Sequence, residues 1–354
     1  MDYALKTKIY NGKLSKGCLQ CVKGEKLVLF ATGLCPRNCF YCPISERKKN
    51  IDIVYANEMP LKNKKHAAEI IREAEMMDAK GAGITGGDPL ARINRTCAFI
   101  RALKKHFGKK FHIHLYTSLN LITKKNLSRL ERAGLDELRL HPDIYDDRLW
   151  KKIDIIKGYN FDVGVEIPVI PGAEKQIIKL ISFFRNKVDF FNLNELEISE
   201  ININKYISRK LHTKKKYSYA VKGSEELAKK LVKKYPMLNI HYCSASFKDK
   251  IQMGRRILRR AKNVKRDFDI ITDEGMLVRG AIYGKNLEKT IAWLKKDFHI
   301  PKSLLFHQKS KRRILTSIEV VKRLSGQLKK KGLKPAIVEE YPTFDEMPVS
   351  VDFV

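Results

Sequence analysis

The sequence lacks any uninterrupted apolar stretch of about 18 residues, the length that a membrane-spanning helix needs. Residues 1–12 also lack the apolar block of a secretory signal peptide. We therefore expect a soluble, cytoplasmic protein that has no membrane partner. The chain has no internal repeat and no low-complexity linker, and an apolar content of 44% is enough for a folded core.

Acidic residues are scarce relative to basic ones, with 39 Asp and Glu against 71 Lys and Arg in 354 residues. The resulting net charge of +32 excludes an acidic enzyme and favours a polyanionic partner such as RNA. Adaptation to high temperature is an alternative, because Lys is abundant and only five Gln occur. It explains part of the Lys count but not the imbalance, since ion-pair networks need matching acids.

The excess charge is concentrated in residues 202–266, which hold twenty basic and three acidic residues. We expect a helix over residues 247–261, in which the pairs Arg255/Arg259 and Arg256/Arg260 stack like charges on one side. Five tyrosines are interleaved with the basic residues: Tyr206, Tyr217, Tyr219, Tyr235 and Tyr242. This segment predicts binding of tRNA or another RNA through phosphate contacts and base stacking. The alternative is a solvated basic face.

Residues 26–198 alternate strand-like and helix-like patterns. We predict strands at residues 26–32, 83–85, 111–117, 137–140, 162–170 and 190–198. We predict helices at residues 64–78, 96–107, 124–133, 145–156 and 174–185, with Gly81, Gly134 and Gly158 as C-caps. Six β/α repeats indicate a parallel sheet that is either doubly wound or curled into a barrel.

The C-terminal part predicts a small α+β domain. A further strand is expected at residues 239–243, followed by a hairpin over residues 268–283. Helices are expected at residues 286–296 and 317–331, and strands at residues 303–306, 335–340 and 349–353. The basic run from Lys309 to Arg313 precedes the second helix and is expected to be solvated or to face a substrate.

The chemistry resides in the cysteines, of which there are seven in a chain without an export signal. Cys35, Cys39 and Cys42 form a C-x3-C-x2-C loop directly after the first predicted strand of the series. Three thiolates at this spacing can hold a cubane iron–sulfur cluster and leave its fourth iron without a protein ligand. An open metal position is a reactive one. A zinc knuckle lacking its fourth ligand and buried structural thiols are the alternatives.

With the aromatic residue Tyr41 before the last cysteine, this loop resembles the signature of the radical SAM superfamily. More specifically, the sequence is similar to archaeal proteins described as relatives of pyruvate formate-lyase activating enzymes. The resemblance implies an α/β fold, a partial (β/α)6 TIM-like barrel with a small C-terminal α+β domain. The expected divisions are an N-terminal extension at residues 1–25, the barrel at 26–200, a basic segment completing or flanking it at 201–266, and the C-terminal domain at 267–354.

The resemblance also implies the cofactors. The three cysteines would hold a [4Fe–4S] cluster, and the fourth iron would bind S-adenosylmethionine, whose reductive cleavage gives a 5′-deoxyadenosyl radical. A donor such as ferredoxin or flavodoxin would supply the electron. By position in the motifs, the expected S-adenosylmethionine contacts are Tyr41, Gly86, Gly87, Asp88, Pro89, Thr117, Ser118, Asn120, His141, Glu166, Ile170, Gly172 and Asn194.

The remaining cysteines predict a second metal site. Cys18 and Cys21 form a C-x-x-C ahead of the barrel, and Cys243 with the nearby His241 completes a Cys3His set for zinc or a second iron–sulfur cluster. Other interpretations are a small knuckle with different ligands, a core role for Cys243, or Cys243 as a catalytic thiol. We expect Cys97 to be a core residue.

The leading functional prediction is a radical SAM enzyme that modifies RNA, most plausibly tRNA, because the cluster supplies chemistry and the basic segment supplies phosphate contacts. The first alternative is an activating enzyme that places a glycyl radical on a partner protein. The second is a non-enzymatic iron–sulfur or zinc protein that binds nucleic acid. The sequence contains no zinc-protease helix motif, nucleophile elbow or phosphate-binding glycine loop.

Overall fold

The computed structural model describes residues 9–64, 67–216 and 218–354. The first eight residues of the predicted N-terminal extension, Lys65 and His66 of the first predicted helix, and Tyr217 lie outside this description. The chain divides into two compact units. The first comprises Met1–Glu75 and Ala79–Met253, and the second comprises Met76–Asp78 and Gly254–Val354. The predicted basic segment of residues 201–266 is therefore shared between the units.

A ten-stranded sheet forms the first unit, and seven of its described strands run parallel. In spatial order these are β2 (Lys26–Phe30), β5 (Gly81–Thr85), β6 (His112–Ser118), β7 (Glu137–His141), β8 (Asp162–Val169), β9 (Phe190–Glu195) and β10 (Ile240–Cys243). β1 (Ile9–Asn11) adds antiparallel to β10, and the hairpin of β3 (Tyr55–Ala56) and β4 (Met59–Pro60) adds beside β2. The partial barrel is confirmed, with β10 as a seventh parallel strand.

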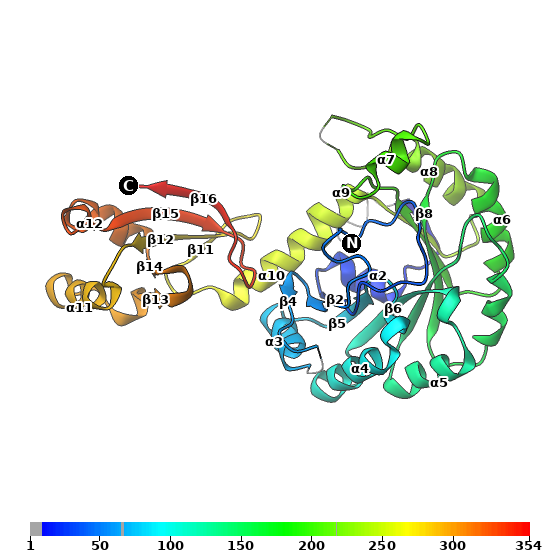
Figure 1. The fold of residues 1–354 in the computed structure, drawn as a ribbon, viewed down its shortest axis with the longest axis horizontal. Coiled ribbons are helices and arrows are strands. Elements are labelled where there is room, and N and C mark those ends of the chain that lie inside the picture. The colour runs from blue at the N-terminus through cyan, green and yellow to red at the C-terminus, as the bar shows by residue number, and fades with distance from the viewer. Residues whose placement is uncertain (1–8, 65–66, 217) are drawn as a thin grey trace. The chain divides into compact units, whose positions relative to one another are not determined.

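Helices cover the outside of the curved sheet, as Figure 1 shows for α4, α5 and α6. The helical segments of this unit are α2 (Lys16–Val22), α3 (Ala68–Met76), η1 (Pro89–Arg92), α4 (Ile93–Phe107), η2 (Leu119–Leu121), α5 (Lys124–Ala133), η3 (Trp150–Ile155), α6 (Glu174–Phe184), α7 (Ile203–Ile207), α8 (Ser224–Lys234), α9 (Ala245–Phe247) and the π-helical η4 (Lys248–Met253). Among the described residues, no helix is long and apolar enough to cross a bilayer.

Local signals explain where these elements agree with prediction and where they differ. The Thr123 hydroxyl accepts from the Asn126 amide at the start of α5, and Gly134 ends this helix with φ of 95°. Gly81 is a strand residue of β5 rather than the expected C-cap. The helix predicted at residues 145–156 is reduced to η3, because the Asp143 and Asp146 carboxylates accept backbone N–H groups that a longer helix would use.

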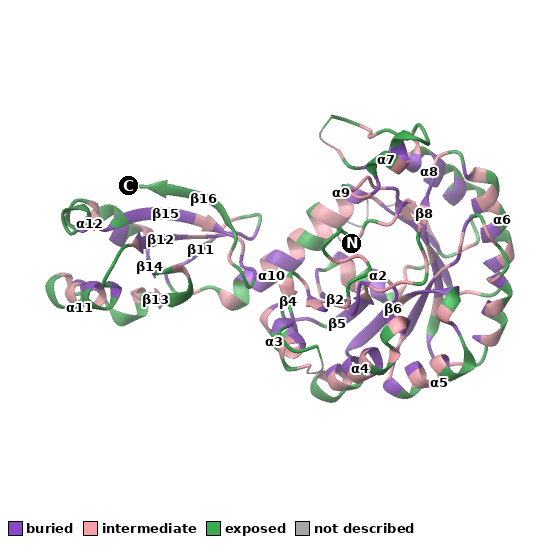
Figure 2. Ribbon diagram, viewed as in Figure 1, coloured by how far each residue is buried: buried purple, intermediate pink, exposed green. Residues whose placement is uncertain are grey.

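The second unit has a βαββαβ arrangement, the connection order of ferredoxin-like folds. Its elements are α10 (Gly254–Val264), β11 (Ile270–Ile271), β12 (Leu277–Tyr283), α11 (Leu287–Phe298), η5 (Lys302–Leu304), β13 (Phe306–Gln308), η6 (Lys309–Lys311), β14 (Arg313–Thr316), α12 (Ile318–Lys330), β15 (Lys334–Glu340) and β16 (Pro348–Phe353). The sheet order is β13-β14-β12-β15-β16, and β11 pairs with β12. Figure 2 shows the buried central strands β12, β14 and β15 in purple.

Two predictions in the second unit were wrong. The strand expected at residues 303–306 is replaced by η5 and the later β13, and β14 was not expected at all. β14 begins at Arg313, the last residue of the basic run that we expected to be solvated. Arg313 is only 2% exposed, because both oxygens of the Glu340 carboxylate pair with its guanidinium. The ion pair is buried, so β14 can begin at a charged residue, and the sequence pattern therefore did not indicate a strand here.

The predicted cationic helix of residues 247–261 is also corrected. It is broken into α9, η4 and α10, and two of its four arginines, Arg256 and Arg260, are buried. Arg260 donates to the carbonyl of Pro342, and Arg259 pairs with Asp78. These guanidinium groups have partners within their own unit, so they do not form the solvated phosphate-binding stripe that the sequence pattern indicated.

Candidate active site

A cavity of about 470 Å³ opens at the carboxyl ends of the barrel strands. The three motif cysteines line its rim, and the last residues of β5, β6, β7 and β9 line its wall. The wall continues down the barrel to Cys21 and Lys26 at the other end of the strands. Barrel active sites are built at this carboxyl end, so the cavity is the candidate active site.

The loop that carries Cys35, Cys39 and Cys42 joins β2 to β3 and is held by its own polar contacts. The Cys42 amide donates to the Cys39 carbonyl at 3.2 Å, which forms a turn between two of the cysteines. Arg37 donates to the carbonyl of His141 at 2.7 Å and pairs with Asp143 at 2.7 Å. The loop is thereby fixed to the end of β7 before any cofactor binds.

The three thiols suit a cubane cluster better than a single ion. Among the described residues, no three His, Cys, Asp or Glu side chains converge on one ion position, as a zinc site requires. Thiolates around a cubane bind three different irons and need not converge. Burial raises the pKa of Cys35 to about 11 and also raises the pKa of Cys39.

The turn after β5 is made of glycine because the cysteine loop passes directly over it. The Gly87 amide donates to the Thr32 carbonyl at 2.7 Å, and the Asp88 amide donates to the Leu34 carbonyl at 2.8 Å. A Cβ on Gly86, whose φ is 146°, would lie 2.3 Å from the Thr32 oxygen. A Cβ on Gly87 would lie 2.4 Å from the Leu34 oxygen. A side chain therefore fits at neither Gly86 nor Gly87, and the turn after β5 and the cysteine loop pack as one unit.

Asp88 is fully buried and stabilises this turn through hydrogen bonds of its carboxylate. Its carboxylate accepts from the Leu90 amide at 3.0 Å, the Thr117 hydroxyl at 2.8 Å, and both the amide and the hydroxyl of Ser118, at 3.0 Å and 2.7 Å. Burial raises its pKa, although these hydrogen bonds oppose the shift. Asp88 therefore connects the Gly-Gly turn to the end of β6 and does not itself line the cavity.

His141 at the end of β7 is a neutral hydrogen-bonding group. Its Nδ1 lies 2.8 Å from the carbonyl oxygen of Glu166, which can only accept, so Nδ1 carries the proton. Its Nε2 then accepts the Tyr41 hydroxyl at 3.1 Å. Burial, together with the nearby Arg37 charge, lowers the pKa of His141 to about 4. This arrangement holds Tyr41, which is part of the cysteine motif, against the cavity wall.

Glu166 of β8 is the centre of a buried polar network. Its carboxylate accepts from Asn194 at 2.8 Å, from Asn192 at 2.9 Å and from Arg139 at 2.9 Å. Arg139 is 3% exposed and also pairs with Glu137 at 2.6 Å. Every charged group in this network has a charged or hydrogen-bonding partner, so the inner wall of the barrel is polar and preorganised.

The structure brings most of the predicted contacts to the cavity. The predicted residues that line it are Tyr41, Gly86, Gly87, Thr117, Ser118, His141, Glu166 and Asn194. Asp88, Pro89 and Ile170 are buried behind the wall, and Asn120 and Gly172 are exposed. Their assignment as S-adenosylmethionine contacts stays a prediction for all of these residues.

The remaining cysteines lie apart from the cluster loop. Cys18 and Cys21 lie on α2, where Cys18 Sγ is 3.3 Å from the Asn192 amide nitrogen, and Cys243 ends β10 beside Gln252. Among the described residues they form no three-ligand group, so the second metal site stays a prediction. Burial raises the pKa of Cys21 to about 11. Cys97 is 1% exposed on α4, as expected of a core residue.

Several residues of the site were not predicted. Arg37 and Arg139 fix the loop and the inner wall, and Lys248 and Glu197 form an ion pair at the cavity mouth. Of these four residues, only Arg37 could have been found from the sequence, because it lies inside the cysteine motif. His112 and His114 are both buried on β6, where Lys26 Nζ lies 2.7 Å from His112 Nδ1.

Comparison with known families gives two matches. Residues 29–181 match the radical SAM superfamily, and residues 275–352 match a domain of unknown function, DUF8061. The chain is 46% identical over 284 residues to a protein of Methanocaldococcus jannaschii, named provisionally as a glycyl-radical enzyme activating enzyme. That alignment covers 77% of this chain and 75% of the relative.

Solved structures with a similar arrangement include two with low sequence identity. Streptococcus suis SuiB bound to S-adenosylmethionine has a TM-score of 0.43 at 17% identity, and the match covers 62% of this chain and 50% of that chain. Methylornithine synthase has a TM-score of 0.41 at 16% identity, and the match covers 64% of this chain and 72% of that chain.

Proposed function

The chain belongs to the radical SAM superfamily, and from this premise we propose that it is an activating enzyme that removes a hydrogen atom from a glycine of a partner protein. The cofactors of the family are a [4Fe–4S] cluster and S-adenosylmethionine, which together supply a carbon radical that abstracts hydrogen. The observation that carries the proposal is the 46% identity to the Methanocaldococcus jannaschii protein over 77% of this chain. This finding favours the activating enzyme over the RNA-modifying enzyme that the charge pattern predicted.

In this proposal the residues around the cavity bind and orient the cofactors. Cys35, Cys39 and Cys42 would hold the cluster. The Gly86–Gly87 turn offers backbone groups at the rim, and the Tyr41–His141 pair fixes the loop above the wall. The polar network of Glu166 offers acceptors for hydroxyl groups deeper in the cavity.

The charge of the cavity mouth supports a neutral target group. Arg37 is paired with Asp143, and Lys248 is paired with Glu197. A phosphate backbone entering this mouth would have to displace these carboxylates, whereas a backbone glycine of a protein carries no charge. The mouth is therefore better suited to a peptide than to a nucleotide chain.

An apolar surface beside the cysteine loop supports a protein partner. Ile203 and Ile207 of α7 are 47% and 63% exposed, and Tyr145 is 55% exposed. Phe40 of the cysteine loop contacts Tyr206 of α7 at a ring-centroid distance of 5.9 Å, and it contacts Tyr145 at 6.5 Å. Exposed apolar side chains grouped next to an active site are typical of protein docking surfaces.

An anaerobic assay distinguishes a protein target from an RNA target. Reconstituted enzyme is mixed with S-adenosylmethionine, dithionite and extract of the source organism, and released 5′-deoxyadenosine is measured. We expect the extract to increase release, protease treatment of the extract to remove the increase, and ribonuclease treatment to leave it intact. Cys39→Ala should abolish release, and Cys97→Ala should not. An increase that is sensitive only to ribonuclease would contradict the proposal.

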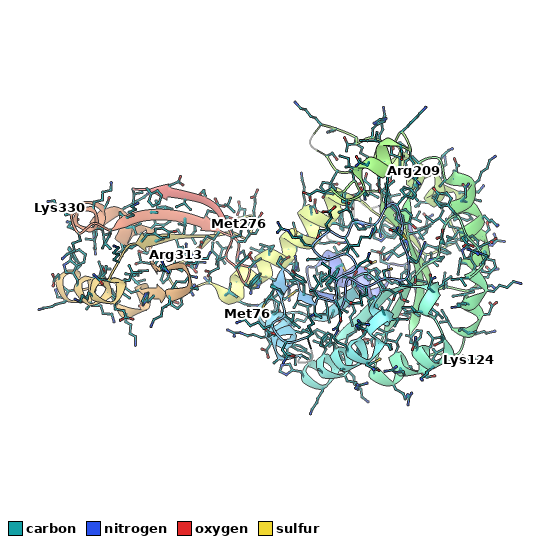
Figure 3. The ribbon with its side chains drawn as sticks, viewed as in Figure 1. Met76, Lys124, Arg209, Met276, Arg313 and Lys330 are labelled. Atoms are coloured by element: carbon teal, nitrogen blue, oxygen red, sulfur yellow. The ribbon has the colours of Figure 1, made fainter. Side chains whose placement is uncertain are left out.

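RNA modification, with tRNA as substrate, is the second candidate, and a group of exposed basic residues next to α7 favours it. Arg209, Lys210, Lys215 and Lys216 are exposed, and Figure 3 labels Arg209 beside this helix. Binding of bulk tRNA that weakens steeply with salt and stimulates 5′-deoxyadenosine release would support this candidate. In either case we propose a cytoplasmic enzyme that receives its electron from a ferredoxin or a flavodoxin.

A further inference from the structure

Three arginines surround the carboxylate of Glu346 on the sheet of the second unit, and a lysine contacts the backbone of the same residue. By strand register, Arg279 of β12 and Arg313 of β14 lie on the face opposite the core formed with α11 and α12. Figure 3 labels Arg313. Arg266 follows α10, and Lys311 precedes β14. The three arginines lie near the carboxylate of Glu346, in the loop of residues 341–347 between β15 and β16, and Lys311 donates to the Glu346 carbonyl and pairs with Glu340.

The carboxylate of Glu346 fits this group of cations poorly. Its oxygens lie 3.5 Å from Arg279, 3.6 Å from Arg313 and 3.9 Å from Arg266. All three distances exceed the usual range of about 2.7–3.2 Å for an N–H···O hydrogen bond. By contrast, the Glu340 carboxylate lies 2.7 Å from Arg313 in the same cluster. The cations are therefore spaced for a larger group than a carboxylate.

Arg279 shows most clearly that this group of cations lacks hydrogen-bond acceptors. Its side chain is 0% exposed, and none of its three guanidinium nitrogens has a hydrogen-bond partner among the described residues. Asp269 approaches Nε at 3.2 Å, but without hydrogen-bond geometry. A fully buried guanidinium with five unused donor hydrogens is costly, and native proteins rarely retain one without a ligand or ordered water.

The backbone at Glu346 is in an unfavourable conformation that places the carboxylate in the cluster. Its φ is 45°, in the left-handed region that residues with a Cβ seldom adopt. Phe344 and Met347 of this loop are 46% and 61% exposed, whereas Pro342 and Thr343 are buried. Withdrawal of the Glu346 carboxylate would relieve this conformation at the exposed end of the loop.

The charges around Glu346 indicate the charge of the ligand that would bind here. The cluster holds four cations, Arg266, Lys311, Arg279 and Arg313, against three carboxylates, Asp269, Glu340 and Glu346. Burial lowers the pKa of Arg266, and the neighbouring positive charge of Arg279 adds to this shift. If Glu346 withdraws, the remaining excess is two positive charges. A phosphate monoester carries about two negative charges at pH 7, and its oxygens match guanidinium groups bidentately.

We propose that the second unit contains a binding site for a phosphate monoester, formed by Arg266, Arg279, Arg313 and Lys311, and that Glu346 fills the site until the ligand displaces it. The amide of Gln308, which donates to the Glu346 carboxylate, would donate to the phosphate in its place. The site does not depend on the radical chemistry of the first unit. The phosphate can be inorganic or part of an organic monoester.

The thermal unfolding midpoint of the full-length protein tests this proposal at pH 7.5, in inorganic phosphate against chloride at equal ionic strength. We expect phosphate to raise the midpoint of the wild type. Glu346→Gln should show the same shift as the wild type at a phosphate concentration at least tenfold lower, because the competing carboxylate is gone. Asp352→Asn is the matched control, since Asp352 is exposed on β16, and it should behave as the wild type.

A second variant keeps the test decisive if Glu346→Gln does not fold. Arg266 is 28% exposed at its side chain, and Arg266→Gln should weaken the phosphate effect at least tenfold in the otherwise wild-type protein. Ribose 5-phosphate should act as inorganic phosphate does, and dimethyl phosphate, a monoanionic diester, should not. Equal phosphate effects in the wild type, Glu346→Gln and Arg266→Gln would overturn the site. Equal effects of the monoester and the diester would overturn the monoester assignment.

Discussion

His141 shows how the fold sets the protonation of single residues at the active site. Its Nδ1 donates to Glu166 and its Nε2 accepts from Tyr41, an arrangement that only the neutral ring allows. His112 is a second example, because burial and the Lys26 charge lower its pKa to about 2. The neutral histidines keep the inner wall of the barrel ordered, and this order depends on pH.

Acidification should therefore destabilise the protein between pH 6.5 and pH 4. The pKa of His141 is about 4 in the folded protein and about 6.5 when unfolded, so the unfolded state binds more protons in this window and stability rises with pH. His141→Gln should reduce the slope of unfolding free energy against pH by up to about 1.4 kcal/mol per pH unit. Denaturant unfolding at several pH values measures the slope. The same change at the partly exposed His106 is the control, and equal slopes in all three proteins would contradict the account.

Asp88 should be important for stability although it does not line the cavity. Asp88→Ala leaves four buried or part-buried donors without their acceptor, namely the Leu90 and Ser118 amides and the Thr117 and Ser118 hydroxyls. We expect a loss of about 3 kcal/mol in the free energy of unfolding. Asp146→Ala, at an exposed carboxylate, is the control and should have little effect. Denaturant titration measures both, and a loss no larger than that of the control would refute this role.

Single residues were predictable from the sequence where local spacing carries the signal. Cys35, Cys39 and Cys42 were found in this way, because a loop ligand set is contiguous in sequence. Arg139 was not, because its partners Glu166 and Cys18 come from β8 and α2, which only the folded barrel brings to β7. Long-range polar networks leave no periodic pattern in a sequence.

At the scale of elements, the cysteine loop and the turn after β5 act as one unit. Gly87→Ala should displace the loop, because the new Cβ would lie 2.4 Å from the Leu34 oxygen and 2.6 Å from the Gly33 oxygen. We expect reduced iron content after anaerobic reconstitution, with the barrel still folded by circular dichroism. Gly326→Ala in α12, where nothing lies within 4 Å of the new Cβ, should retain full iron content. Equal iron in both variants would show that the loop does not depend on this turn.

α7 provides a second element-scale prediction. Ile207→Glu places a charge in the apolar surface beside the cysteine loop, so it should reduce stimulation of 5′-deoxyadenosine release by the partner protein at least tenfold. Release without partner should not change, because α7 does not line the cavity. Met237→Glu, at a 92% exposed residue in the loop before β10, is the matched control. A loss of release without partner as well would indicate damage to the site instead.

Elements were predictable in the barrel and less so in the second unit, for physical reasons. β6, β7 and β9 alternate polar residues with buried apolar ones, and the parallel strands lie between amphipathic helices, so β5 to β9 were expected within a few residues. β14 was not expected, because Arg313 at its start is charged and is buried only by pairing with Glu340. The helix of residues 145–156 was overpredicted, because aspartate side chains compete for its backbone N–H groups.

At the scale of the whole molecule, the net charge of +32 is not one continuous surface. Arg256 and Arg260 are buried, Arg259 is paired with Asp78, and Lys214 is paired with Glu195 and Glu225. The sequence could show that basic residues cluster in residues 202–266, but not that the fold neutralises part of them. For this reason the charge pattern alone predicted an RNA substrate. The archaeal relative and the paired charges around the cavity favour a protein target instead.

The central claim is that radical chemistry at Cys35, Cys39 and Cys42 removes hydrogen from a glycine of a partner protein. Transfer of deuterium from α-deuterated glycine in the extract protein to 5′-deoxyadenosine, measured by mass spectrometry, tests this most directly. We predict 5′-deoxyadenosine heavier by one mass unit with deuterated glycine and unlabelled product with deuterated alanine, and neither product with Cys39→Ala. Unlabelled 5′-deoxyadenosine from glycine-labelled protein, released at the same stimulated rate, would contradict the account.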